Sequence, residues 1–408
     1  MNFSLHEKKR IKIIMLVITI LGQASIALYL PALPSIAKDL NITDFQSKLT
    51  ITYFIIGFGI SPLFMGPISD YWGRKPILLF SLITALIGFL GNSFCSSFYM
   101  FVIFRVIEGI GCGGLLTSGR SIARDVFSGK ELASASSYLS MGFALGFGFS
   151  PVVGGFLAEH FIWQSAFIFL FIFCFSIICI CILFLPETKQ FKEHDDSHHI
   201  MKSILQSYIT AVLNKLFIIN ILAGFFAYCI VISYNTLTPF LVQINLGFSA
   251  ENYGYLAILI GVPYFLAASI NRKLVLEKGI YFSCLIGGTT IILSGFIMFI
   301  FSLFGYRNIY TLIIPFMGAT FGQAFIFSNT IAAAMQLFPA NVAGRISALY
   351  SSLQMILVSV FSLFIAKTPD RIDYVACIII CVGFLSFVAV IFSEKARKYV
   401  IEVKVKAD

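Results

Sequence analysis

Long apolar stretches alternate with short polar breaks along the entire chain. Most of these stretches contain about 20 residues, the length at which an α-helix crosses the hydrocarbon core of a bilayer. The pattern therefore predicts twelve membrane-spanning helices and an all-α fold. The predicted spans are residues 11–33, 47–67, 77–95, 98–119, 132–157, 164–186, 216–240, 252–270, 280–303, 309–333, 344–366 and 372–392.

One longer polar stretch, residues 187–215, divides the twelve spans into two sets of six. This division is typical of transporters whose two six-helix halves are related by an axis along the membrane normal. We therefore expect one six-helix bundle over residues 1–186 and a second over residues 216–392. Residues 187–215 then form a cytoplasmic linker, and residues 393–408 form a cytoplasmic tail.

The linker carries a run of acidic and histidine side chains at residues 193–199. These side chains can bind metals, but a run in a polar segment lacks a fixed outer shell to orient the ligands, which favours a solvated linker without a metal. Apolar residues then recur at helical spacing over residues 204–213. They predict a short amphipathic helix on the inner surface of the membrane.

The composition excludes a soluble globular protein, since 59% of the residues are hydrophobic and only 12% are charged. We expect the first span to be a membrane span and not a cleavable signal peptide, because its apolar core is too long and no small-residue cleavage site follows it. The nine cysteines lie almost entirely within the spans and form no C-x-x-C pair. We interpret them as small apolar packing residues.

Lys and Arg are distributed unequally over the predicted loops, and this distribution predicts the orientation. Of the 28 basic residues, five lie in loops on one side, and these are Lys38, Lys48, Arg307, Lys367 and Arg371. Arg105 lies inside a span, and the other 22 lie on the opposite side. Both termini are therefore predicted to be cytoplasmic. The net charge of +9 follows from this bias and needs no nucleic-acid partner.

A compact polar loop, G-x-x-x-D-x-x-G-R-K, joins the second and third spans at residues 66–76. Its candidate functional residues are Gly66, Asp70, Gly73, Arg74 and Lys75. We expect the two glycines to permit a tight backbone and the three charged side chains to pair with one another at the membrane surface. Residues 271–279 occupy the equivalent place in the second half and keep a basic pair and a glycine, but not the Asp.

The fourth span contains Arg105 and Glu108, the only charges that we place well inside the hydrocarbon. They are three residues apart and share a helix face. Such charges are costly in lipid and should face the protein interior. Two interpretations stay open, a mutually neutralised structural pair and a charge linked to substrate or protons.

The fifth span carries a stripe of small residues at four-residue spacing together with a proline. The stripe consists of Gly142, Gly146, Ser150 and Gly154, with Pro151 and Gly155 beside it. Small residues in one row let a neighbouring helix approach closely, and the proline bends its own helix. Any pair of closely packed helices can use this pattern, so the stripe alone is compatible with a packing role.

These motifs resemble those of the major facilitator superfamily. Residues 66–76 resemble its most diagnostic loop, and Arg105-x-x-Glu108-Gly109 resembles a motif whose arginine is tied to proton coupling. Residues 142–155 resemble the antiporter motif of its drug-exporting members. Residues 29–37, 120–127 and 338–349 are similar to segments of the bicyclomycin-resistance (Bcr/CflA) branch. The resemblance covers nearly the whole chain and is stronger in the first half.

The resemblance implies a secondary active exporter of small lipophilic or cationic compounds that exchanges them for protons by alternating access. It implies no cofactor, because the proton gradient is the energy source. The expected partners are a small-molecule substrate, protons and membrane lipid. The resemblance further implies a monomer in the bacterial cytoplasmic membrane, with both termini inside.

One position departs from the branch, which commonly has an Asp in the first span where this chain has Ala27. Glu108 is then the only carboxylate that we place well inside the membrane. If this protein couples transport to protons, Glu108 is the predicted proton-linked residue and Arg105 its partner. The sequence leaves open whether coupling to protons occurs.

The candidate substrate cavity is polar and aromatic. Its predicted residues are Gln23, Tyr29, Tyr53, Tyr228, Tyr234, Asn235, Gln323, Asn329 and Gln354. The chain also contains 45 phenylalanines, which suit a lipophilic substrate.

Three other functions were considered. A transporter that exports an endogenous metabolite or siderophore is the main alternative. A polytopic membrane enzyme is less well supported, because the spans contain no His, no Asp pair and no metal-ligand spacing, and the chain has no P-loop. A receptor or scaffold would not explain two charges inside the fourth span.

Overall fold

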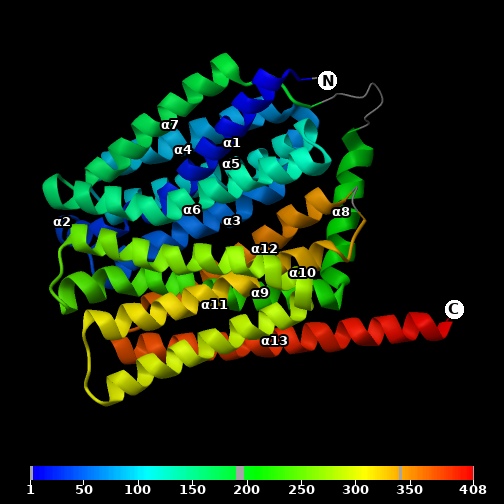
Figure 1. Cartoon of the computed structure of the whole chain (residues 1–408). Coiled ribbons are helices and arrows are strands. Elements are labelled where there is room, and N and C mark those ends of the chain that lie inside the picture. Colours follow the sequence, from blue (N-terminus) through cyan, green and yellow to red (C-terminus); the bar gives the residue numbers. More distant parts are fainter. Residues whose placement is uncertain (1–2, 190–196, 340–341, 408) are drawn as a thin grey trace. The chain divides into compact units, whose positions relative to one another are not determined.

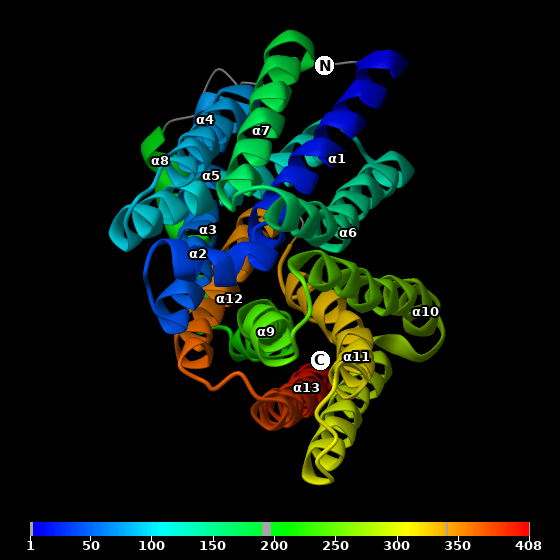
Figure 2. The same cartoon turned by 90° about the vertical axis from the view of Figure 1, so that its left-hand side faces the viewer.

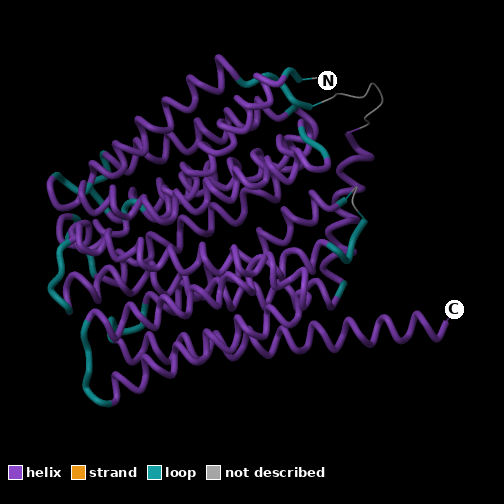
Figure 3. Tube along the Cα trace, viewed as in Figure 1, coloured by secondary structure: helices purple, strands orange, loops and turns teal. Residues whose placement is uncertain are grey.

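The computed structural model describes residues 3–189, 197–339 and 342–407, and these residues form helices joined by short turns without any β-strand (Figure 3). The chain divides into two compact units. Unit 1 contains Met1–Leu205 and Gly247–Ile258, and unit 2 contains Gln206–Leu246 and Leu259–Asp408. The division therefore passes through α8 (Ser197–Leu213) and α10 (Ala250–Leu303).

Unit 1 is built around α5 (Phe98–Val126), which packs against α1, α3, α4 and α6 (Figure 1). The other helices of unit 1 are α1 (Leu5–Ala27), α2 (Leu33–Asp39), α3 (Asp44–Trp72), α4 (Arg74–Ser93), α6 (Gly129–His160) and α7 (Gln164–Phe184). Capping boxes at Ser4 and Thr43 start α1 and α3, because each side chain accepts a hydrogen bond from a backbone N–H that has no partner inside the helix.

Unit 2 is built around α9 (Lys215–Phe240), which packs against α11, α12 and α13 (Figure 2). These helices are α11 (Ile309–Met335), α12 (Ala343–Ala366) and α13 (Ile372–Ala407). A π-helical turn, Leu241–Asn245, follows α9 and leads towards α10. The segment 393–408, predicted as a tail, continues as helix α13 through Ala407.

Eleven helices of the described residues are long and apolar enough to cross a membrane. The difference from the twelve predicted spans lies in α10, whose 54 residues contain two of them, 252–270 and 280–303. Gly279 separates the two with non-helical angles, φ 83° and ψ 169°. The predicted all-α membrane fold is confirmed, and the chain is a multi-pass membrane protein.

The predicted first span, 11–33, lies within a candidate membrane span from Leu5 to Asp39, which is not one continuous α-helix. Helix α1 ends at Ala27, and a 3-10 helix at Leu30–Ala32 and the short α2 follow it. Pro31 and Pro34 lie at this break, and each lacks the backbone N–H that an α-helical ladder uses.

The loop predicted at residues 66–76 is almost entirely helical, so that interpretation was wrong. Helix α3 continues through Trp72 with Pro67 inside it, and α4 begins at Arg74. Gly66 is an ordinary helix residue and does not form the turn. Gly73 alone makes the break with φ 104°, a conformation that favours glycine. Continuing the helix keeps its backbone groups paired, which outweighs the polar character of the segment.

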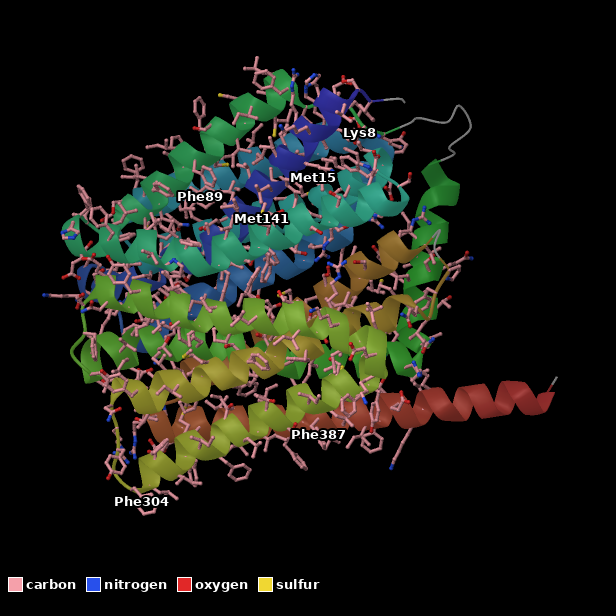
Figure 4. The ribbon with its side chains drawn as sticks, in the orientation of Figure 1. Lys8, Met15, Phe89, Met141, Phe304 and Phe387 are labelled. Carbon is pink, nitrogen blue, oxygen red and sulfur yellow. The ribbon has the colours of Figure 1, made fainter. Side chains whose placement is uncertain are left out.

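Many outward-facing side chains are large and apolar, as expected for helices surrounded by lipid. Phe304 at the end of α10 is 75% exposed and Leu183 in α7 is 72% exposed. Figure 4 shows Phe304 projecting outward in the turn that follows α10. In α8, Ile204 is buried while Leu205 and Leu213 are exposed. Attachment of α8 to the membrane surface stays a prediction.

Candidate functional site

The centre of unit 1 holds a buried ion pair on α5. Arg105 Nη1 lies 2.8 Å from Glu108 Oε1, and neither side chain is exposed. The other carboxylate oxygen, Oε2, accepts a hydrogen bond of 2.7 Å from Asn92 Nδ2 on α4. Each carboxylate oxygen of Glu108 therefore has its own partner, Arg105 on α5 for Oε1 and Asn92 on α4 for Oε2.

Arg105 is held by aromatic rings as well as by hydrogen bonds. Its guanidinium carbon lies 4.1 Å from the ring centroid of Tyr29 and 4.3 Å from that of Phe54. Nη1 donates to the carbonyl of Ser25 at 3.3 Å, and Nε donates to that of Thr50 at 3.4 Å. Cation–π contacts and carbonyls offset part of the cost of burying a charge.

Glycines allow these helices to approach closely. A Cβ atom on Gly88 of α4 would lie 2.6 Å from the Cα atom of Glu108. A Cβ atom on Gly109 of α5 would lie 2.2 Å from the carbonyl oxygen of Phe54 on α3. Larger residues would separate the helices that hold the ion pair.

A second charged cluster surrounds the break between α3 and α4. Arg74 Nη1 lies 2.6 Å from Asp70 Oδ1, and Arg74 Nε lies 2.5 Å from Asp125 Oδ2 at the end of α5. Lys75 does not pair with Asp70 as expected, because its Nζ points to α7 and donates to the carbonyl of Ile182 at 3.0 Å. Arg74 thus links the ends of α3, α4 and α5.

Glu187, which no sequence motif indicated, closes this cluster. Its Oε1 accepts from the backbone N–H of Arg74 at 2.9 Å, and its Oε2 accepts from that of Lys75 at 3.1 Å. It therefore caps the first turn of α4. A Cβ atom on Gly73 would lie 2.6 Å from Oε2, so glycine leaves the space that this cap fills. Lys189 Nζ donates to the carbonyl of Asp70 near the end of α3.

In unit 2, a buried network of uncharged side chains connects the helix segments on either side of the equivalent break at Gly279. Asn329 Nδ2 on α11 donates to Asn271 Oδ1 at 3.0 Å and to Ser283 Oγ at 3.1 Å. Asn271 precedes Gly279 in α10, and Ser283 follows it. Asn329, predicted for the substrate cavity, therefore takes part in a buried network that joins both parts of α10 to α11.

The small-residue stripe of α6 faces α1 and the segment after it. Cβ atoms on Gly142, Gly146 and Gly154 would lie 2.7, 2.8 and 1.6 Å from the carbonyl oxygens of Leu16, Ile20 and Leu28. Ser150 Oγ donates to the carbonyl of Gly146 within the helix. A Cβ atom on Gly155 would lie 2.6 Å from the carbonyl oxygen of Ala250, and Pro151 lies inside α6 next to Gly254.

The predicted cavity residues fall into different surroundings. In unit 1, Tyr29 belongs to the Arg105 cluster, Gln23 is buried beside Gly146, and Tyr53 is half-buried. In unit 2, the rings of Tyr228 and Tyr234 contact Phe327 and Phe316 on α11. Asn235, Gln323 and Gln354 are buried, each with at least one amide atom that has no hydrogen-bond partner among the described residues.

The acidic and histidine run at residues 193–199 and the nine cysteines are the remaining candidates for metal or thiol chemistry. Residues 193–196 lie outside the described part of the chain, and nothing is described for the side chains of residues 197–199. Among the described side chains, no group of His, Cys, Asp and Glu is arranged to hold a metal ion. All nine cysteines are free thiols.

The chain is similar to known proteins over most of its length. The sequence model of the Major Facilitator Superfamily matches residues 15–362. Multidrug resistance protein D of Escherichia coli is 28% identical over 371 residues, which are 88% of this chain and 89% of that protein. The bicyclomycin resistance protein homolog of Haemophilus influenzae is 24% identical over 383 residues, 90% of this chain and 92% of that protein.

A solved structure shows the same fold. The crystal structure of a D-xylose-proton symporter superposes with a TM-score of 0.72 over 94% of this chain and 96% of that chain. The sequence identity is only 15%, so this similarity concerns the arrangement of the helices and not the transported compound.

Proposed function

The chain belongs to the major facilitator superfamily, and on that premise we propose that it exports small lipophilic or cationic compounds in exchange for protons. Membership makes it a transporter of small molecules rather than an enzyme. Export of drug-like compounds is supported by the relatives named multidrug resistance protein D and bicyclomycin resistance protein homolog. We further propose a bacterial cytoplasmic membrane location with both termini inside, from the unequal distribution of Lys and Arg.

The observation that carries the proton-coupling part is the buried pair of Arg105 and Glu108. A carboxylate without exposed surface needs partners to stay ionised. Glu108 has two, Arg105 and Asn92, and these come from two helices. Separation of α4 from α5 at this point would remove Asn92 from Glu108 and favour its protonation, and the return of α4 would favour release of the proton.

The competing role is purely structural, in which Glu108 and Arg105 form an ion pair that neutralises both charges. We favour the functional role because Ala27 leaves the first span without a carboxylate. Replacing a buried ion pair with apolar residues of similar size is often neutral or stabilising, so stability alone is a weak reason to retain one.

The cluster at Asp70 and Arg74 supports the alternating-access part of the proposal. Arg74 connects the ends of three helices, and Glu187 attaches the segment after α7 to the start of α4. These ends cannot move apart without breaking charged hydrogen bonds. We propose that the cluster sets the rate at which the transporter changes conformation, with the proton gradient as the energy source and no cofactor.

The experiment is accumulation of cationic dyes and antibiotics in cells that produce the protein and in cells that carry an empty vector. The proposal predicts lower accumulation with the protein, and a protonophore should abolish the difference. Export that resists the protonophore would contradict proton coupling. If no compound of the panel is exported, the drug-export proposal fails and an endogenous metabolite or siderophore becomes the better substrate class.

A further inference from the structure

The end of α6 meets the start of α10 within unit 1, which includes residues 247–258. A Cβ atom on Gly155 of α6 would lie 2.6 Å from the carbonyl oxygen of Ala250. A Cβ atom on Gly254 of α10 would lie 2.4 Å from the carbonyl oxygen of Pro151. Glycines on both helices therefore let the last turns of α6 approach the first turns of α10 closely.

An ion pair lies at the end of this helix contact. His160 Nε2, in the last turn of α6, lies 3.4 Å from Glu251 Oε2, in the first turn of α10. The imidazole side chain is 50% exposed and the carboxylate side chain is 28% exposed, so water reaches both groups. The two side chains attract each other as opposite charges only while His160 carries a second ring proton.

The positions of the two residues favour the charged form of this pair. The end of a helix carries partial negative charge and its start carries partial positive charge. Protonated His160 lies at the end of α6, and ionised Glu251 lies at the start of α10, so each helix stabilises the charge that it carries. The ring of Phe156 lies 4.6 Å from the ring of His160 between centroids, and an aromatic ring at this distance attracts a cation.

Two further titratable side chains lie at the same contact, and each has its own partner. Glu159 Oε2 accepts a hydrogen bond from the backbone N–H of Ala250 at 3.0 Å and caps the start of α10. The Tyr255 hydroxyl on α10 donates to Glu251 Oε1 at 2.7 Å. The second oxygen of Glu251 therefore faces His160 while the first is held by its own helix.

The other elements around the end of α6 bring few charges. The last turn of α1, the 3-10 helix at Leu30–Ala32 and the first turns of α5 and α7 contain no charged residue. On α2, Asp39 Oδ2 accepts a hydrogen bond of 2.7 Å from Trp163 Nε1, just before α7. Glu251 is therefore the carboxylate that the described contacts assign to His160.

The pair lies where a helix passes from one unit into the other. Helix α10 belongs to unit 1 as far as Ile258 and to unit 2 from Leu259. With both termini inside, as proposed, α6 ends and α10 begins on the outer side of the membrane. Alternating access predicts that outer helix ends separate when a compound is released, which would break the contact between His160 and Glu251.

We propose that His160 and Glu251 form a pH-sensitive contact, here termed the outer latch, which acid on the outside closes by protonating His160. The proposal rests on the export function and adds a regulatory step to it. Imidazole changes its charge within the physiological range of pH. The protonated ring holds Glu251 and keeps α6 against α10, whereas the neutral ring releases it. External acid then favours closure of the outer side after the compound has left.

The test uses the full chain in liposomes that have the same pH on both sides, so neither a proton gradient nor the orientation of the protein influences the result. The probe is tetraphenylphosphonium, a lipophilic cation. Exchange of labelled for unlabelled probe is measured at about pH 5.5 and about pH 8. The variants are His160→Gln and Glu251→Gln. The matched control is His6→Gln, the same change at an exposed residue of α1.

The measured quantity is the exchange rate in acid divided by the rate at about pH 8. This ratio should be about two- to fivefold higher in His160→Gln than in the original chain, the effect of one exposed ion pair. Glu251→Gln should give the same ratio, and combining the two changes should add nothing. Titration of Glu108 affects every one of these chains, so the comparison isolates the outer latch. His6→Gln should match the original chain.

An unchanged ratio in His160→Gln would overturn the proposal. An increase in His160→Gln that Glu251→Gln lacks would also overturn it, because His160 would then act without its partner. In either case exchange by the original chain would leave the export function intact.

A second measurement does not depend on transport. Thermal unfolding in detergent compares the original chain with His160→Gln at the same two pH values. The variant should have the lower Tm in acid, where the pair is charged, and the same Tm at about pH 8, where the imidazole is neutral. This result in a chain that does not exchange the probe would support the outer latch and contradict export of the cation. Equal Tm values at both pH values would overturn the outer latch.

Discussion

The chain breaks a helix twice in a similar way, at Gly73 between α3 and α4 and at Gly279 within α10. Gly73 has φ 104° and ψ 164°, and Gly279 has φ 83° and ψ 169°. The surroundings differ. Around Gly73 lie Asp70, Arg74 and Glu187, whereas a Cβ atom on Gly279 would meet no atom within 4 Å.

The same contrast holds deeper in the two units. Unit 1 buries Arg105 against Glu108, and unit 2 joins its helices through Asn271, Ser283 and Asn329. An uncharged network has no net charge to exchange with a proton or a cation. Under the proposed function, the groups suited to energy coupling lie in unit 1, because only there is a buried ion pair described.

The largest expected effect comes from breaking the buried ion pair. Arg105→Met leaves Glu108 without its cationic partner and should lower the free energy of unfolding by about 3–5 kcal/mol. Asn329→Leu, the matched change in unit 2, removes uncharged hydrogen bonds and should cost about 1–3 kcal/mol. Chemical unfolding in detergent measures both.

A double variant, Arg105→Met with Glu108→Leu, should recover much of the lost stability, because no unpaired charge remains. Equal costs for Arg105→Met and Asn329→Leu would remove the energetic difference between the two units.

The second-largest expected effect is a difference between the variants Gly73→Ala and Gly279→Ala. Alanine at either position adopts a strained positive φ, at a cost of about 1–3 kcal/mol. Gly73→Ala should cost about 0.5–2 kcal/mol more, because its methyl group displaces the Glu187 cap of α4. Transport by Gly73→Ala should therefore fall well below transport by Gly279→Ala. Similar rates in the two variants would show that the cap has no influence on the cycle.

A smaller effect on stability, but a specific one on turnover, is expected for Asp70→Asn. The change weakens the link from Arg74 to the end of α3 and keeps the link to Asp125. The transport rate should fall while equilibrium binding of tetraphenylphosphonium stays nearly constant. A large loss of binding together with a normal rate would instead assign Asp70 to the substrate site.

The smallest effect concerns an exposed pair at the start of α6. The hydrogen bond from Lys8 holds the pKa of Glu131 below its ordinary value of 4.5. A lowered pKa in the folded state means that the stabilisation is present above the unfolded pKa and disappears as the pH falls through the folded pKa. Glu131→Gln should lower the Tm slightly at neutral pH. A Tm difference that persists in acid would contradict this assignment.

The sequence predicted the helices better than it predicted their contacts. Apolar length alone located the spans, because lipid forces each backbone group to be paired within a helix. The same physics explains the error at residues 66–76, where polar side chains indicated a loop but the helix continued to Trp72. Helix α3 ends only where Gly73 adopts a positive φ.

The site was predicted where the partners are close in sequence and missed where they are distant. Arg105 and Glu108 share a helix turn, so their pairing follows from spacing. Glu187 reaches the N–H group of Arg74 across 113 positions, and Asn92 reaches Glu108 from another helix. Single-chain patterns contain no information on such contacts, which depend on how the helices pack.

The central claim is that unit 1 couples transport to protons through Glu108, and Glu108→Gln tests it most directly. The variant is reconstituted in liposomes and compared with the original chain in two assays, pH-gradient-driven accumulation and exchange of labelled for unlabelled tetraphenylphosphonium. The proposal predicts that Glu108→Gln loses accumulation and keeps exchange. Full-rate accumulation against a concentration gradient by Glu108→Gln would contradict it and make the buried pair structural.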